Sequence, residues 1–212
     1  TYKILVFNYD AKNIDFRNMS RFDEAEAYIL QTKATGQASQ GITPLYGFVV
    51  DSLEITPGQD KSGTLVLTPL VRHVTFTVQV DKPEEIKTCK GSLSGVSTSL
   101  NLSKRKVVTE ASTNVEFDME TSDKGVNGDL IILGTALPKE EEQKPVTNQV
   151  TIDFTLSDGS MVSATADLED KLNEIDTPHV NVTINATVEK SPKFTIRLTN
   201  WEVGPGEETT IE

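Results

Sequence analysis

Residues 179–203 read H-V-N-V-T-I-N-A-T-V-E-K-S-P-K-F-T-I-R-L-T-N-W-E-V, and this stretch decides the class of fold. Apolar residues alternate with Asn and Thr over 180–188, and an alternation with polar residues resumes over 194–199. A period of two predicts strands that bury one face and expose the other. The short polar connection, 189–193, predicts that the two strands pair antiparallel. Because a lone hairpin is marginally stable, its apolar face requires a second layer.

Short strand patterns of the same kind follow one another along the rest of the chain. We expect strands over 2–9, 13–17, 46–50, 52–55, 64–68, 71–80, 87–96, 97–102, 107–108, 113–119, 130–133, 150–156 and 161–165. Turn signals separate them at intervals of about 8–12 residues, which is typical of β-sandwiches. The sequence therefore predicts an all-β protein.

Two further segments complete the assignment of secondary structure. Residues 167–175 carry the one convincing helical pattern, with three aliphatic residues at helical spacing and a proline after the end. Residues 20–30 fit two structures, because a serine followed by acidic residues resembles a helix start and alternating aliphatic residues resemble a strand. We favour a strand over 25–31.

Pro69 lies between two groups of strand patterns and marks the predicted domain boundary. We expect two tandem β-sandwich domains, 1–69 and 70–212, with one short helix in the second. The first is small for a domain, and its strand pattern begins at residue 2 in a chain without an initial Met. We therefore expect a trimmed or processed chain whose first sandwich lacks its first strand.

Composition and charge argue against several classes of partner. The chain has 212 residues and a formal net charge of −12, from 32 acidic and 20 basic residues. Nucleic acid requires basic patches, so we expect no nucleic-acid partner. The same charge disfavours direct adsorption to an anionic bilayer. No apolar run reaches the ~18 residues of a membrane span, and residues 1–212 contain no signal-peptide pattern.

No grouping of residues predicts catalysis, a cofactor or a metal site. His73 and His179 lie outside every metal-ligand spacing such as HxxxH, and we expect both at the surface. The run G-S-L-S-G at 91–95 fails as a nucleophile elbow because Leu93 occupies the serine position. Its small residues instead suggest a strand that a neighbour approaches closely. Cys89, the only cysteine, is expected to be a small core residue.

The matched period of two in several strands predicts one shared core in the second domain. Its expected members are Val74, Phe76, Val78, Ile152, Phe154, Val182, Ile184, Phe194 and Ile196. The inward phase of these residues requires that the strands around 76 and 184 face the same interior.

Three segments, taken in order, carry a family resemblance. They are Y-K-I-L-V-F-N-Y-D at 2–10, L-V-R-H-V-T-F-T-V at 70–78 followed by G-S-L-S-G-V-S-T-S-L-N-L at 91–102, and I-R-L-T-N-W-E-V-G-P-G at 196–206. Their order and spacing resemble the FimB-like family of fimbrial anchor and accessory proteins from Bacteroides-type bacteria. The resemblance spans nearly the whole chain.

The resemblance implies two tandem transthyretin-like β-sandwiches on a lipoprotein at the outer membrane. Members of the family anchor or terminate a pilus, so the implied partners are fimbrial subunits of the same system. The implied localisation is the cell surface, at the outer membrane, within a fimbrium. Membrane attachment would use an N-terminal lipid on a Cys upstream of residue 1, which this chain does not include.

Two classes of function follow, and an enzyme is disfavoured. The first is a structural protein that joins a fimbria by strand addition, since an unpaired sheet edge is a template for another chain's strand. The candidate edge residues are Tyr2, Ile4, Leu5, Val6 and Phe7. The alternative is a carbohydrate- or host-binding sandwich, for which exposed aromatic residues are the discriminating feature.

Overall fold

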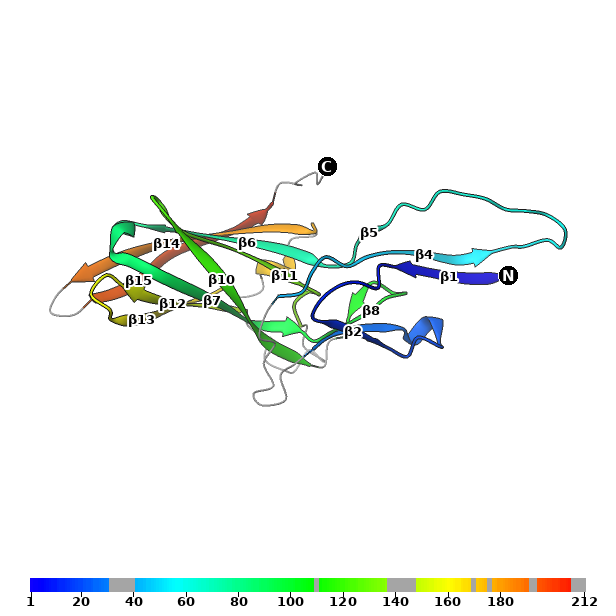
Figure 1. Cartoon of the computed structure of the whole chain (residues 1–212), viewed down its shortest axis with the longest axis horizontal. Coiled ribbons are helices and arrows are strands. Elements are labelled where there is room, and N and C mark those ends of the chain that lie inside the picture. The colour runs from blue at the N-terminus through cyan, green and yellow to red at the C-terminus, as the bar shows by residue number, and fades with distance from the viewer. Residues whose placement is uncertain are drawn as a thin grey trace.

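A computed structural model of the protein describes residues 1–30, 41–108, 111–136, 148–168, 171–174, 177–190 and 194–206. Strands dominate this part of the chain, and its one α-helix, α1 (Lys171–Glu174), is short (Figure 1). The prediction of an all-β protein with sandwich-like domains is confirmed. No helix in these residues is long and apolar enough to cross a membrane.

The elements follow the chain in a simple order. The strands are β1 (Tyr2–Phe7), β2 (Ile14–Arg17), β3 (Glu26–Ile29), β4 (Tyr46–Leu53), β5 (Thr68–Pro69), β6 (Arg72–Val80), β7 (Ile86–Ser97), β8 (Ser99–Asn101), β9 (Lys106–Val107), β10 (Ser112–Ser122), β11 (Gly125–Ile132), β12 (Gln149–Leu156), β13 (Met161–Asp167), β14 (His179–Lys190) and β15 (Phe194–Pro205). Two short 3₁₀ turns, η1 (Phe22–Glu24) and η2 (Pro83–Glu85), precede β3 and β7.

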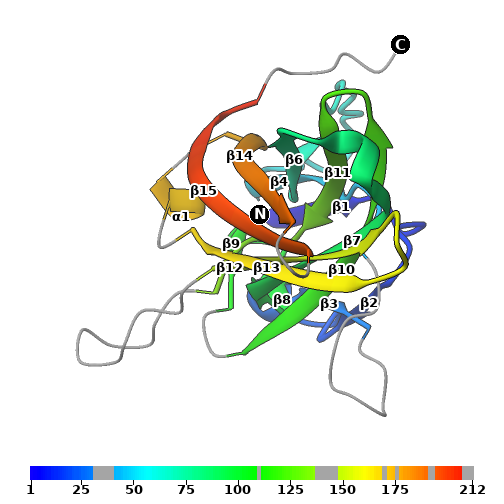
Figure 2. The same ribbon diagram turned by 90° about the vertical axis from the view of Figure 1, so that its left-hand side faces the viewer.

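Eight strands form one large sheet in the order β13-β12-β7-β10-β11-β6-β14-β15. Neighbouring strands are antiparallel except β14 and β6, which are parallel. The two end strands, β13 and β15, contact each other, so the sheet curls until it is nearly closed (Figure 2). The predicted C-terminal hairpin is confirmed as β14 and β15, with an irregularity between Asn185 and Ala186.

The interior of the large sheet is filled by the inward phase of each strand. In β6, for example, Val74, Phe76, Val78 and Val80 are buried while the alternate residues are not. Eight of the nine predicted core residues lie in one buried cluster, namely Val74, Phe76, Val78, Ile152, Phe154, Val182, Ile184 and Ile196. The ninth, Phe194, lies outside the residues whose side chains are described.

Two small sheets extend from one end of the large one (Figure 1). One has the order β1-β4-β5 and the other β2-β3-β8-β9. Aromatic side chains join them, because the ring centroids of Phe7 on β1 and Phe16 on β2 lie 4.8 Å apart. The apolar cluster is continuous through both regions and includes Ile14 and Leu45.

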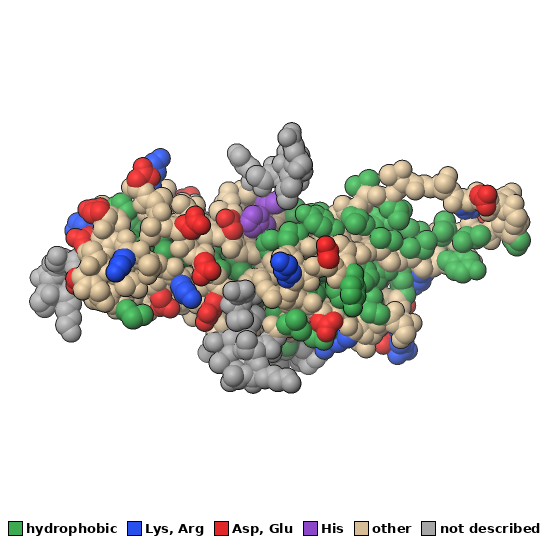
Figure 3. Space-filling model, in the orientation of Figure 1, with side chains coloured by type: hydrophobic (Ala, Val, Ile, Leu, Met, Phe, Trp, Pro, Cys, Tyr) green, Lys and Arg blue, Asp and Glu red, His purple; other side chains and the backbone are tan. Residues whose placement is uncertain are grey.

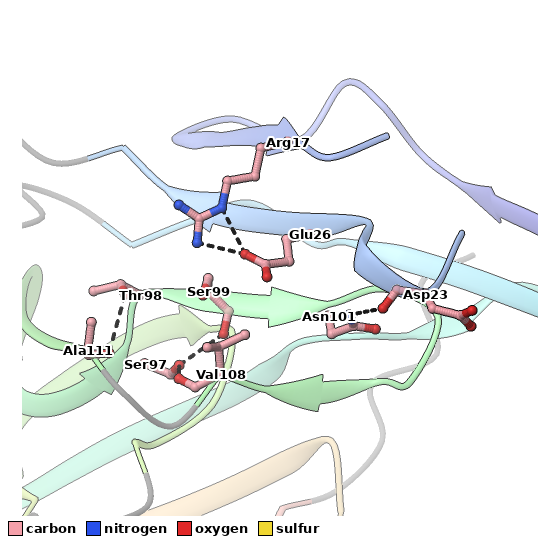
Figure 4. Close-up of polar contacts among 9 residues, drawn as sticks. All are labelled: Arg17, Asp23, Glu26, Ser97, Thr98, Ser99, Asn101, Val108 and Ala111. Atoms are coloured by element: carbon pink, nitrogen blue, oxygen red, sulfur yellow. Dashed lines mark hydrogen bonds and ion pairs between the residues drawn. The ribbon is translucent and has the colours of Figure 1, made fainter. Parts of the chain in front are cut away.

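The chain passes from the large sheet to a small one at Ser97–Ser99, between β7 and β8 (Figure 4). The buried Ser97 hydroxyl donates to the carbonyls of Ser99 (3.0 Å) and Val108 (3.1 Å). Further along β8, the Asn101 amide donates to the Asp23 carbonyl at 2.9 Å. These bonds satisfy buried polar groups where a strand changes sheets, which would otherwise destabilise the fold.

The predicted division into 1–69 and 70–212 stays a prediction. Within the described residues, β8 pairs antiparallel with β3 and β9 pairs with β8. Residues 99–107 therefore complete a sheet begun by the N-terminal strands, although they follow Pro69 in the sequence. A local pattern of alternation identifies such strands but does not name their neighbours.

Some predicted boundaries differ from the structure. The two strands expected over 46–50 and 52–55 are the single strand β4. Of the strand expected over 64–68, only Thr68 pairs, as part of β5. The segment at 25–31 forms the strand β3 over its described central residues, as favoured. Intrinsic strand propensity at 64–67 is not matched by pairing, because propensity depends on neighbours.

Gly91 is the position in β7 where a side chain of the neighbouring strand approaches most closely. A Cβ built on Gly91 would lie 2.3 Å from Cζ of Phe117 on β10, and one built on Gly128 of β11 would lie 3.0 Å from the same ring. The Phe117 ring thus covers the glycines of both flanking strands, and it stacks on Phe76 at 4.8 Å. The expected close approach is found at Gly91, and its cause is this ring.

Candidate functional site

Strand β1 is an edge strand of its sheet among the described residues. It pairs with β4 alone, through Tyr2↔Leu53, Ile4↔Val50, Leu5↔Val49, Val6↔Phe48 and Phe7↔Gly47. The five residues predicted as a strand-addition edge therefore share one strand. An edge strand presents a row of N–H and C=O groups that another extended segment can bond.

The backbone direction identifies which groups face the open side. The Asn8 N–H donates to the Tyr46 carbonyl at 3.3 Å, so Asn8 faces β4. Successive residues of a strand point their N–H and C=O groups in opposite directions. Val6 therefore faces β4 as Asn8 does, whereas the backbone groups of Leu5 and Phe7 point to the open side.

The side chains of β1 divide between two faces of the sheet. Leu5 and Phe7 pack against the buried core. Ile4 and Val6 alternate with them and lie on the other face, where they are half-buried beside their partners on β4. Figure 3 shows hydrophobic side chains gathered over this end of the molecule. The edge is thus bordered by apolar surface, which suits an apolar strand.

One end of β1 is held by charge contacts. Lys3 forms an ion pair with Asp23 at 3.2 Å, and its ammonium lies 4.9 Å from the centroid of the Phe22 ring. Both ionic side chains are well exposed, so the pair contributes little to stability. It positions the beginning of β1 against η1.

A second surface feature is an aromatic cluster just beyond β1. Tyr9 is 73% exposed, and its ring stacks on Phe16 with centroids 5.0 Å apart and planes 23° apart. The ring centroid of Phe7 lies 6.4 Å from that of Tyr9, so the three rings form one cluster. The sequence predicted a strand over 2–9, whereas β1 ends at Phe7. Tyr9 therefore lies beyond the strand, where alternation does not indicate burial.

The two histidines lie side by side, which the sequence did not reveal. His73 and His179 occupy paired positions of the parallel strands β6 and β14, and their ring centroids lie 5.5 Å apart. Nε2 of His73 lies 3.1 Å from an Asp129 carboxylate oxygen. No group of three or more His, Cys, Asp or Glu residues in the described ranges is placed to hold a metal ion.

Cys89 has the environment of an inert thiol. It is buried in β7, and burial raises its pKa to about 11. A thiol that stays protonated at neutral pH is a poor nucleophile. Its sulfur lies 3.6 Å from the Met119 carbonyl, to which the thiol donates. The expected role as a small core residue is confirmed.

Several solved structures share this fold. A candidate adhesin of Bacteroides ovatus, 20% identical, matches with a TM-score of 0.57 over 93% of this chain and 74% of its own. The fimbrial anchor protein Mfa2 of Porphyromonas gingivalis, 13% identical, matches with 0.57 over 97% and 75%. A candidate polysaccharide-binding protein of Bacteroides thetaiotaomicron, 12% identical, matches with 0.51 over 98% and 76%.

At these levels of identity the similarity establishes the fold. No curated protein matches the sequence. A family model matches residues 1–118, which comprise β1 to β9 and most of β10. The chain belongs to the family described as DUF5119, a domain of unknown function.

Proposed function

We propose that this chain is a non-enzymatic structural protein of the bacterial cell surface, an anchor or accessory subunit of a fimbria of the FimB-like type. It joins fimbrial subunits by β-strand addition at β1. The observation that carries the proposal is the open edge of β1, where the backbone groups of Leu5 and Phe7 point away from β4. Fold similarity to a fimbrial anchor over nearly the whole chain supports it.

The chemistry of the edge favours a particular partner. An added strand would bond the backbone of Leu5 and Phe7 and place its side chains beside Ile4 and Val6 on one face. The partner is then an extended segment with apolar residues at alternate positions, supplied by a fimbrial subunit of the same system. In this proposal a lipid upstream of residue 1 attaches the protein to the outer membrane, and no nucleic acid is bound.

Hydrogen exchange should resolve the two sets of amides in β1. In the free protein, the Val6 and Asn8 amides should exchange slowly because they face β4. The Leu5 and Phe7 amides should exchange faster. Adding purified fimbrial subunits from the source organism should slow Leu5 and Phe7 by about tenfold or more, because strand addition gives those N–H groups acceptors. Residue-resolved exchange followed by NMR measures all four amides.

A matched pair of variants tests the same edge by binding. Ile4→Lys puts a charge beside the edge, a device that natural proteins use to prevent strand addition. Ile55→Lys makes the same change at an exposed position outside β1. Subunit binding should fall with the first variant and not with the second. The proposal fails if Leu5 and Phe7 are already protected in the free protein, or if both variants bind equally.

A carbohydrate- or host-binding surface is the second candidate, and the stacked pair Tyr9 and Phe16 favours it. An exposed aromatic face supported from behind by a second ring is a suitable platform for a sugar ring or an apolar host group. The two candidates concern neighbouring surfaces of the same end of the molecule. Substitutions at Ile4 and at Tyr9 distinguish the two candidates, because each candidate predicts a loss of binding at a different one of these residues.

Removing the Tyr9 ring should weaken glycan binding if this second role is correct. Tyr9→Ala removes the platform and should weaken binding to an immobilised polysaccharide by about tenfold, equivalent to ~1.4 kcal/mol. Tyr9→Phe retains the ring and should retain most of the affinity. Glycan-array binding of the three proteins measures the effect. Equal signals from wild type and Tyr9→Ala would exclude Tyr9 as a platform.

A further inference from the structure

In the sheet β1-β4-β5, most of β4 has no strand beside it on the β5 side. β4 continues to Leu53, but β5 pairs with it only through Tyr46↔Pro69 and Gly47↔Thr68. Residues 48–53 therefore have a partner strand on the β1 side and none on the other side within the described chain. This second open edge is distinct from the outer edge of β1.

The segment that leads into β5 has the composition of a missing strand. It reads T-L-V-L-T over 64–68, a run of residues with good strand propensity. Leu65, Val66 and Leu67 are 46%, 69% and 38% exposed. Figure 1 shows this segment as an extended trace that returns toward β5. Three consecutive exposed apolar residues next to an open sheet edge are an association hazard unless something covers them.

The register of β5 shows how the segment and the edge fit. Extending the ladder beyond Gly47↔Thr68 creates three pairs, Phe48 opposite Leu67, Val49 opposite Val66, and Val50 opposite Leu65. Every one of these pairs is apolar on both sides. β1 already pairs Val6 with Phe48 and Ile4 with Val50. The extension would therefore continue two apolar rows across three strands.

The connection between β4 and residues 64–67 already contains the turn that a hairpin of these two segments needs. The Gln59 N–H donates to the Thr56 carbonyl at 3.2 Å, and Gly58 adopts a φ of 77°. Glycine reaches this left-handed region without steric cost. The ammonium of Lys61 donates to the Glu54 carbonyl, which links the two sides of the connection near its turn. Closing the hairpin requires that residues 64–67 move toward β4, and it requires no new turn.

We infer that residues 64–67 form a strap that closes onto β4 as an extension of β5. Closure buries Leu65, Val66 and Leu67 and occupies the second open edge of the sheet. The strap then becomes the outermost strand on this side of β4, at the opposite end of the sheet from the outer edge of β1. The inference rests on register and exposure, and it holds whether or not fimbrial subunits add at β1.

A cysteine pair tests the register directly. Val50→Cys with Leu65→Cys places two thiols at positions that closure makes directly opposite. Val50→Cys with Gly63→Cys is the matched control, because Gly63 lies two residues out of register and a Cβ there would meet nothing within 4 Å. Cys89 should not compete, since burial raises its pKa to about 11. In a glutathione buffer, the first pair should form an intrachain disulfide at least tenfold faster than the second.

Three other results would each overturn the inference. Equal rates for the two pairs would mean that the strap has no preferred register. Disulfides between two molecules, seen as dimers on a non-reducing gel, would mean that the strap pairs with a second copy. Leu70 donates to the Leu45 carbonyl, so by alternation Val66 is the residue of 65–67 whose N–H faces β4 on closure. An unprotected Val66 amide in wild-type hydrogen exchange would mean that the strap stays open. None of these measurements reads the Leu5 and Phe7 amides, so failure here is distinguishable from failure of strand addition at β1.

Discussion

Phe154→Ala is expected to lower the free energy of unfolding by about 3–5 kcal/mol, the usual cost of truncating a buried aromatic residue. Phe154 is 1% exposed and lies on β12 between Cys89 of β7 and Val162 of β13. Strands on both sides hold the backbone, so the cavity left by the ring cannot close by local collapse. Denaturant unfolding measures the loss as a lower midpoint with an unchanged slope.

Met161→Ala is the matched control for this substitution. Met161 begins the neighbouring strand β13 and is 79% exposed, so its truncation removes little buried surface. We expect a change within about 0.5 kcal/mol, as for most surface substitutions. A loss below ~1 kcal/mol for Phe154→Ala would mean that Phe154 does not belong to the core.

Gly91→Val is expected to destabilise the fold by about 3 kcal/mol, at the upper end of the cost of overpacking a core. The new Cβ would lie 2.3 Å from the Phe117 ring, which in turn stacks on Phe76. The ring has little room to move, because a Cβ on Gly128 at its other flank would lie 3.0 Å away. Thermal and denaturant unfolding measure the loss.

Two variants show whether the Phe117 ring causes this effect. Gly204→Val makes the same change where a Cβ would meet nothing within 4 Å, and it should cost far less. Adding Phe117→Leu to Gly91→Val should recover part of the lost stability, because the smaller side chain frees space. A double-mutant cycle that shows no coupling between 91 and 117 would contradict the packing explanation.

Alternation in the sequence predicted which residues are buried, because burial on one face of a strand is a local property. The inward phases of β6, β12 and β14 were predicted from period two, and eight of the expected core residues share one cluster. The antiparallel hairpin β14–β15 was predicted from its short connection. These features depend only on the pleat of each strand and on its pairing with the next strand in the sequence.

Pairings between distant segments could not be predicted in the same way. β8 pairs with β3 and β14 pairs in parallel with β6, yet nothing in the pattern of these strands names the partner. The adjacency of His73 and His179 follows from that parallel pairing and was missed for the same reason. The expected strand at 64–68 shows the converse, since propensity without a partner does not produce a ladder.

The candidate edge was predicted as a strand, and its position in the sheet comes from the structure. Residues 2–9 showed a nearly continuous apolar run, which indicates a strand covered in part on both faces. Only the sheet order places β1 at an edge. Only the bond between Asn8 and Tyr46 distinguishes the backbone groups of Leu5 and Phe7 from those of Val6. Such directions depend on three-dimensional pairing and have no signature in composition.

The parallel contact between β14 and β6 sets the order in which the large sheet can assemble. β6 emerges from the ribosome long before β14, and until β14 is made β11 is the one described strand that can pair with β6. Closing so long a loop is slow, because its entropy must be lost before the contact forms. We therefore expect a nascent chain to pass through a stage with an open curved sheet and an exposed apolar interior. That stage is where aggregation competes with folding and where a chaperone would have the greatest effect on yield.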